Sequence, residues 1–71
     1  MTYVPKHRGE PVTKYRVRYI ERERGWAPDE WHVDYDTHAE ASRNVRETNT
    51  RPDGPVPDVY ITAYYVGEVV L

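Results

Sequence analysis

The sequence predicts an α+β domain of the order β-β-α-β, in which a three-stranded antiparallel-type sheet of spatial order 2-1-3 packs one helix on one face. Three observations predict it: two short segments alternate apolar and polar side chains, a capped helical segment follows them, and a long apolar strand comes last. The 71 residues suffice for one small domain. We expect a flexible N-terminal arm over residues 1–12, which contain two prolines and no period, and a single domain over residues 13–71.

Residues 13–24 and 30–35 predict the first two strands. In the first segment Tyr15, Val17 and Tyr19 alternate with basic residues. The second segment alternates in the same way, with Trp31, Val33 and Tyr35 apolar, and this is the two-residue period of a half-buried strand. Gly25 and Pro28 between them favour a connecting loop. The two strands are therefore expected to form a β-hairpin whose odd positions face the core.

Residues 38–49 predict the helix. Thr37 and Glu40 have the spacing of a capping box, in which the threonine hydroxyl accepts a hydrogen bond from the Glu40 amide. The apolar stripe of this helix has small side chains, which suit a sheet face of large rings. Asn49 is expected to end the helix in the left-handed conformation.

Residues 58–71 predict the third strand, with its odd positions toward the core. Its even positions are half apolar too, and a strand that is apolar on both sides usually has both sides covered. The helix spans about 18 Å and the strand about 45 Å, so the helix covers less than half of it. Three features could account for the part of the strand that the helix does not cover: a bend at Gly67, a cover from Tyr3 and Val4, or a second chain.

The charge is unevenly distributed along the chain. Residues 1–24 contain seven Lys/Arg against three Glu, whereas residues 25–49 contain two Arg against six Asp/Glu, and the net charge is −2. The basic and acidic thirds are therefore expected to pair in the fold. The chain has no cysteine, which excludes disulfides and thiolate metal sites, and no run of about 18 apolar residues that would span a membrane. No membrane partner is expected, and a bacterial cytoplasm is the expected location.

Motifs for catalysis and metal binding are sparse. His32, Asp34 and His38 could offer nitrogen and oxygen ligands to Zn²⁺ or Mn²⁺. The alternation instead favours solvated residues on different elements, so neither a metal nor any other cofactor is expected. Ser42 is the only serine and has no base at a recognisable spacing, so no catalytic residue and no enzymatic activity are expected.

The outer sheet face, made by the even positions, is the predicted binding surface. Tyrosine and arginine are the side chains that most often anchor protein interfaces. The residues expected to contact a partner are Arg16, Arg18, Trp26, Tyr60, Tyr64, Val66 and Val70. Trp26 could instead fold back over the end of the core. The same arginines and tyrosines could also hold single-stranded nucleic acid by stacking and phosphate contact, or form a solvated face of cross-strand pairs.

The segments 14–19 and 56–67, with the acidic capped helix between them, resemble the small β-β-α-β accessory proteins that phages and prophages encode. Some of those proteins, including anti-CRISPR proteins, block host defence systems. The resemblance rests on size, element order and composition, and it assigns no role to any residue. It implies a compact non-enzymatic protein that binds and occludes a host protein or complex, often as a dimer, and so acts as an inhibitor. The apolar C-terminal strand is where we expect this chain to form a homodimer. A single-stranded nucleic-acid-binding protein and a small-ligand or metal-binding protein are the alternatives.

Overall fold

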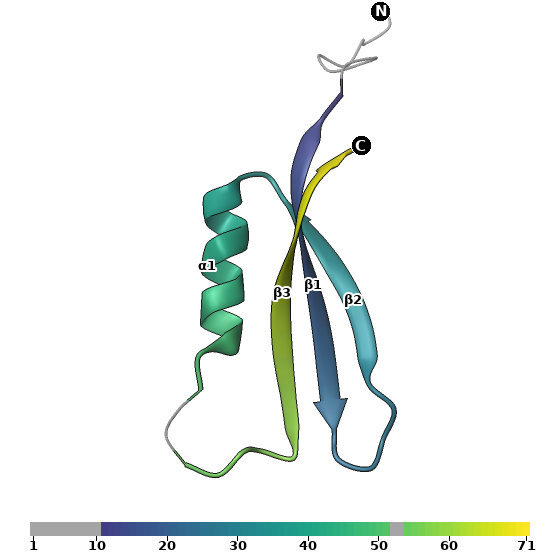
Figure 1. Ribbon diagram of the computed structural model, residues 1–71, viewed down its shortest axis with the longest axis vertical. Coiled ribbons are helices and arrows are strands. Elements are labelled where there is room, and N and C mark those ends of the chain that lie inside the picture. The colour runs from purple at the N-terminus through teal and green to yellow at the C-terminus, as the bar shows by residue number, and fades with distance from the viewer. Residues whose placement is uncertain (1–10, 52–53) are drawn as a thin grey trace, which may run out of the picture.

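The computed structural model describes residues 11–51 and 54–71, and over them it has the predicted α+β architecture (Figure 1). The elements are β1 (Thr13–Glu23), β2 (Asp29–Tyr35), α1 (His38–Asn49) and β3 (Val59–Val70). The strands form one antiparallel sheet in the order β2-β1-β3, with α1 on one side of it. The predicted fold class and strand order are therefore confirmed.

The hairpin of β1 and β2 forms because apolar odd positions meet across it. Facing pairs are Tyr15 with Tyr35, Val17 with Val33, and Tyr19 with Trp31. The Tyr19 and Trp31 rings stack with their centroids 5.7 Å apart. Trp31 and Val33 are nevertheless 40% and 38% exposed, because α1 packs mainly against β3 and leaves β2 largely uncovered. The core is therefore narrower than the alternation alone indicated.

The core lies between α1 and the β1–β3 half of the sheet. Its buried members are Val17, Tyr19, Ala41 and Ala63, and Tyr15, Tyr35, Val45 and Ile61 pack around them. Small helix side chains thus face rings from the sheet, as expected. The Tyr19 hydroxyl shares a hydrogen bond with the Tyr35 hydroxyl, and burial, together with that bond, raises the pKa of Tyr19 well above its ordinary value.

Helix α1 begins as predicted and ends differently. Thr37 Oγ1 accepts a hydrogen bond from the Glu40 amide at 3.1 Å, so the expected N-cap is confirmed. The left-handed stop at Asn49 is wrong, since Asn49 is helical and no described residue other than glycine has a positive φ. Thr50 instead leaves the helix in an extended conformation, and its amide donates to Arg46 O at 3.0 Å. Within the described ranges, no helix has the length and apolar character needed to cross a bilayer.

A β-bulge interrupts β3 at Val66. Val17 lies opposite Tyr65, but the preceding residue Arg16 lies opposite Gly67, which leaves Val66 as one extra residue on β3. Gly67 has φ 143°, a conformation that a side chain would strain. Side chains alternate with a period of two, so one extra residue turns every following side chain to the other face of the sheet.

The prediction that all odd positions of the terminal strand face the core is wrong beyond this bulge. Val69 lies opposite Lys14, on the face away from α1, and Val70 lies opposite Thr13, on the side of α1. Leu71 follows the alternation and lies on the same face as Val69. An irregularity at Gly67 was one of the three expected explanations for the uncovered length of the strand, and the structure contains it. Tyr3 and Val4, which belong to another of the three, lie outside the described residues.

β1 and β3 continue together past the end of β2 (Figure 1). Pairing between β1 and β2 ends at Tyr15, whereas Leu71 donates its amide to Val12 O at 2.9 Å and Val12 donates to Leu71 O at 3.4 Å. Val12 therefore belongs to the sheet rather than to the predicted arm, whose residues 1–10 lie outside the described residues. We call residues 12–14 and 69–71 the terminal ribbon.

Candidate functional site

The helix-free face, meaning the sheet face opposite α1, carries a continuous apolar row along β3. The apolar row consists of Tyr64, Val66, Val69 and Leu71. Tyr64 is 48%, Val66 55% and Leu71 63% exposed, while Val69 is half-buried. Tyr64 and Val66 were predicted for this surface, whereas Val69 and Leu71 reach it only because the bulge reverses the alternation.

Contacts on the two faces of the sheet show on which face the side chains near the bulge lie. Tyr65 places its ring 5.1 Å from that of His38 on α1, so it lies on the helix side. Val66 instead lines a hollow of about 370 Å³ with Arg16, Arg18 and His32, to which Glu30 and Trp31 also contribute. Val70, which was predicted for the binding surface, lies on the helix side of the terminal ribbon.

A row of ion pairs lies beside the apolar row. Arg16 donates from Nε to Asp34 Oδ1 at 2.8 Å and from Nη2 to Asp34 Oδ2 at 3.0 Å, a bidentate pair across β1 and β2. Lys14 Nζ contacts Asp36 Oδ1, and Arg18 Nη2 contacts Glu30 Oε1, each through a single ion-pair contact. The hydrogen bonds from Arg16 lower the pKa of Asp34 below its ordinary value. The predicted pairing of the basic and acidic thirds is therefore confirmed.

The ion pairs change what this face can bind. Each basic side chain of β1 from Lys14 to Arg18 already has a carboxylate partner on the side of β2. A phosphate would have to displace those carboxylates, so the arrangement gives little support to nucleic-acid binding. The same partners hold the guanidinium groups in fixed positions, which suits a contact with another protein surface.

The part of the helix-free face around Ile20 and Tyr60 is less exposed than the apolar row. Ile20 is only 5% exposed although no helix lies above it. The Arg51 guanidinium lies 4.9 Å from the centre of the Tyr60 ring, and it donates to Ile61 O at 3.0 Å and to Thr62 Oγ1 at 3.2 Å. Tyr60 is consequently half-buried, and it is less available to a partner than the predicted surface assumed.

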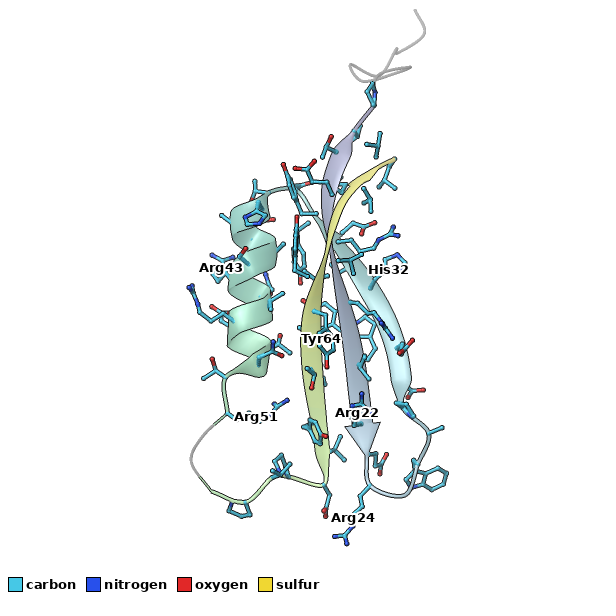
Figure 2. The ribbon with its side chains drawn as sticks, viewed as in Figure 1. Arg22, Arg24, His32, Arg43, Arg51 and Tyr64 are labelled. Carbon is cyan, nitrogen blue, oxygen red and sulfur yellow. The ribbon has the colours of Figure 1, made fainter. Side chains whose placement is uncertain are left out.

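The free edge of β3 is capped over part of its length. Asn49 donates from Nδ2 to Ala63 O at 2.9 Å and accepts from the Ala63 amide at Oδ1 at 2.8 Å, as a neighbouring strand would. Arg51 covers the next outward carbonyl, that of Ile61. Figure 2 shows Arg51 directed from the end of α1 toward β3. Sequence reasoning missed this role of Asn49, because its position at the helix end also matches a helix stop.

The edge beyond these caps has no such cover among the described residues. Backbone groups of successive strand residues point alternately to the two sides. Since Leu71 bonds to β1 in both directions, Val69 and Gly67 also point to β1. Glu68 and Val70 consequently direct their N–H and C=O groups to the free edge, in a stretch that is apolar except for Glu68.

The candidate metal ligands do not come together. His32 and Asp34 lie on β2, on the helix-free face. The ring of His38 lies on the helix side, 5.9 Å from that of Tyr15 and 5.1 Å from that of Tyr65. Residues 11–51 and 54–71 contain no group of three His, Cys, Asp or Glu side chains that could hold a metal ion.

Ser42 and His38 form a pair that sequence reasoning missed. Ser42 Oγ lies 3.4 Å from His38 Nδ1, one helical turn away, and both residues are exposed. Neither the hollow beside Val66 nor the one lined by Trp26 includes the pair. Its position on an open surface gives no support to nucleophilic catalysis, which needs an oriented base and a bound substrate.

Trp26 lies at the opposite end of the molecule from the apolar row and is 74% exposed. It does not cover the core, which was the alternative interpretation. It lines a hollow of about 420 Å³ between the hairpin loop and residues 56–58, together with Arg22, Arg24 and Tyr60. The Arg24 amide donates to Asp58 O at 3.0 Å and joins the two loops, and Figure 2 shows Arg22 and Arg24 at this end.

Comparisons of the chain with family models, with curated proteins and with solved structures give no match.

Proposed function

We propose that this chain is a small protein-binding module that contacts its partner through the apolar row of the helix-free face. The single observation that carries the proposal is the bulge at Val66, because it gathers Tyr64, Val66, Val69 and Leu71 on one face where neither α1 nor β2 covers them. A soluble monomer gains nothing from an exposed apolar row, and such patches commonly mark interaction sites.

The neighbouring ion pairs favour a protein as that partner. Arg16 and Arg18 stand beside the row with their guanidinium groups held by carboxylates. Held arginines around an aromatic and aliphatic centre match the usual composition of a protein interface, in which a desolvated apolar core has a polar rim. Nucleic acid would instead require unpaired cations along the same path.

The resemblance to phage accessory proteins gives this module a proposed setting. In that setting the partner is a protein or complex of a bacterial host, and binding inhibits it by covering a working surface. The module needs no chemistry of its own for such inhibition. The bacterial cytoplasm, the phage origin and the anti-defence activity are part of this proposal.

A photo-cross-linking experiment in bacterial cells tests the binding surface. A benzoylphenylalanine replaces Tyr64 in one variant and Arg43 in the matched control, because Arg43 lies on the outer side of α1, away from the sheet (Figure 2). We expect a discrete product from the Tyr64 position that excess unlabelled chain competes away. Adding Val66→Asp should weaken that product about tenfold or more, since it places a charge in the centre of the apolar contact.

The outcome that would contradict the proposal is also specific. Equal products from both positions would mean indiscriminate collision. A Tyr64 product that Val66→Asp leaves unchanged would mean that the apolar row does not make the contact.

A further inference from the structure

The apolar row of one chain is small for the function proposed above. Its exposed fractions correspond to roughly 300–400 Å² of apolar surface, about half of the ~800 Å² that each partner contributes to a standard interface. The free edge of β3 lies immediately beside the row. A second sheet joined at this edge would extend the helix-free face without covering it.

We propose that two copies of this chain pair through the open part of the β3 edge, from Gly67 to Leu71, and so join their apolar rows into one binding face. The pairing is antiparallel and two-fold symmetric, and it makes a six-stranded sheet of order β2-β1-β3-β3-β1-β2. This inference rests on the proposed function for the use of the joined face, but not for the pairing itself.

The terminal ribbon supplies the first argument for the pairing. It is a two-stranded ribbon, because β2 ends opposite Tyr15 while β1 and β3 stay paired beyond it and backbone hydrogen bonds also join the adjoining residues Val12 and Leu71. Two strands alone are marginally stable in water. Val70 and Leu71 are 67% and 63% exposed there. A second copy would turn the ribbon into four strands and cover part of these side chains.

The contrast along the β3 edge supplies the second argument. Asn49 and Arg51 satisfy the outward backbone groups of Ala63 and Ile61, so strand addition is blocked beside α1. Glu68 and Val70 direct their backbone groups outward beyond the bulge with no such cover in the part of the chain that the structure describes. An uncapped apolar edge is a template for another strand.

Charge and alternation select one register. Pairing Glu68 with Glu68 of the second copy would oppose like charges directly, which is destabilising. Moving the two-fold axis to Val69 places each Glu68 opposite Val70 of the other copy, and the outward groups of these two residues then face one another. Leu71 would lie opposite Gly67 of the other copy, above which there is open space.

Single-cysteine variants test this register directly, because the natural chain has no cysteine. In the proposed register the two Val69 residues form a non-hydrogen-bonded pair with Cα atoms about 4.5 Å apart, within the range a disulfide accepts. We expect Val69→Cys to form disulfide-linked dimers about tenfold faster or more than Val56→Cys. Val56 is an equally apolar control, 71% exposed at the other end of the molecule. Equal rates would overturn the proposal.

A proline substitution tests the edge itself. Val70→Pro removes an N–H that points to the free edge and leaves the bonds to β1 intact, as edge positions tolerate. Sedimentation velocity over micromolar to millimolar protein should show a weak dimer for the natural chain, with a dissociation constant about tenfold or more higher for Val70→Pro. A strict monomer over this range overturns the pairing. A dimer that Val70→Pro leaves unchanged overturns the edge and indicates packing between faces.

The two proposals fail separately. If the natural chain stays monomeric while the Tyr64 cross-link survives, the face acts in a single copy and only the pairing is overturned. If the dimer forms but no specific Tyr64 product exists, the proposed function fails and the pairing stands. If both hold, Val70→Pro should also weaken the Tyr64 product, because it divides the joined face.

Discussion

Replacing Asn49 by alanine tests whether a single side chain takes the place of a fourth strand. The Asn49 amide makes two hydrogen bonds of 2.9 and 2.8 Å to the backbone of Ala63, which is itself 2% exposed. Alanine removes both bonds, keeps the helix and leaves two backbone groups beside the core without their partner. The fold loses both the bonds and the attachment of the helix end to β3.

The size of the effect follows from these two bonds. A hydrogen bond within a protein contributes about 0.5–1.5 kcal/mol, and unpaired groups cost more where water cannot replace the partner. We expect Asn49→Ala to lower the free energy of unfolding by about 1–2.5 kcal/mol, against a total of about 4–10 kcal/mol for a chain of this length. The melting temperature should fall by about 5–15 °C.

Urea unfolding followed by tryptophan fluorescence measures this loss, and Asn44→Ala is the matched control. Asn44 lies on the same helix, but its amide donates only to Glu40 O, at 2.8 Å, within α1. Alanine there should change the free energy of unfolding by no more than about 0.5 kcal/mol. The reasoning is refuted if Asn49→Ala unfolds within about 0.5 kcal/mol of the natural chain, or if the two variants lose equal stability.

Three further outcomes follow from the charges and the buried hydroxyl. The pKa of Tyr19 is raised, so the stability that its neutral form contributes is complete below the ordinary pKa near 10 and is lost as the pH rises beyond it. Urea unfolding at several alkaline pH values should show that the free energy of unfolding falls more steeply with pH for the natural chain than for Tyr19→Phe, and equal slopes would contradict this. The pKa of Asp34 is lowered, so the stability that its ionised form contributes is present above the ordinary pKa near 4 and is lost as the pH falls through the lower pKa of the folded state. In urea unfolding at several acidic pH values, Asp34→Asn should reduce the fall of the free energy of unfolding with decreasing pH, and an unchanged fall would show that the pair with Arg16 adds no stability. Fluorescence anisotropy with a single-stranded oligonucleotide at physiological salt should show no saturable binding, since Lys14, Arg16 and Arg18 are paired with carboxylates. Tight binding that weakens steeply with salt would instead favour a nucleic-acid partner.

The alternation of apolar and polar residues in the strands and the N-cap of the helix make much of this fold predictable. Alternation placed the hairpin within a residue or so of its observed bounds, and Thr37 located the start of α1. These signals are local, since each depends on neighbouring side chains along one element. The strand order followed from them because few connections between such elements are allowed.

The candidate site could be predicted only in part, because it depends on one inserted residue. Tyr64 and Val66 follow from alternation, but the strand is apolar at odd and even positions alike, so the pattern does not reveal a change of face. Gly67 is the only local signal, since an isolated glycine within a strand indicates a bulge. The burial of Ile20 and the pairing of Asn49 with Ala63 depend on side chains distant in the sequence, which no local pattern contains.

The bulge at Val66 makes the identity of the exposed surface depend on how β3 pairs with β1, and not only on its composition. Closing the bulge with every residue kept would restore the unbroken alternation and return Val69 and Leu71 to the side of α1, with Val70 taking their place. Deleting Val66 alone would leave Val69 opposite Lys14, because the bulge already sets this one residue aside. Gly67 has the positive φ found at the bulge, so a substitution at this one position is a route by which a lineage of such proteins could exchange one exposed face for another with almost no change in composition.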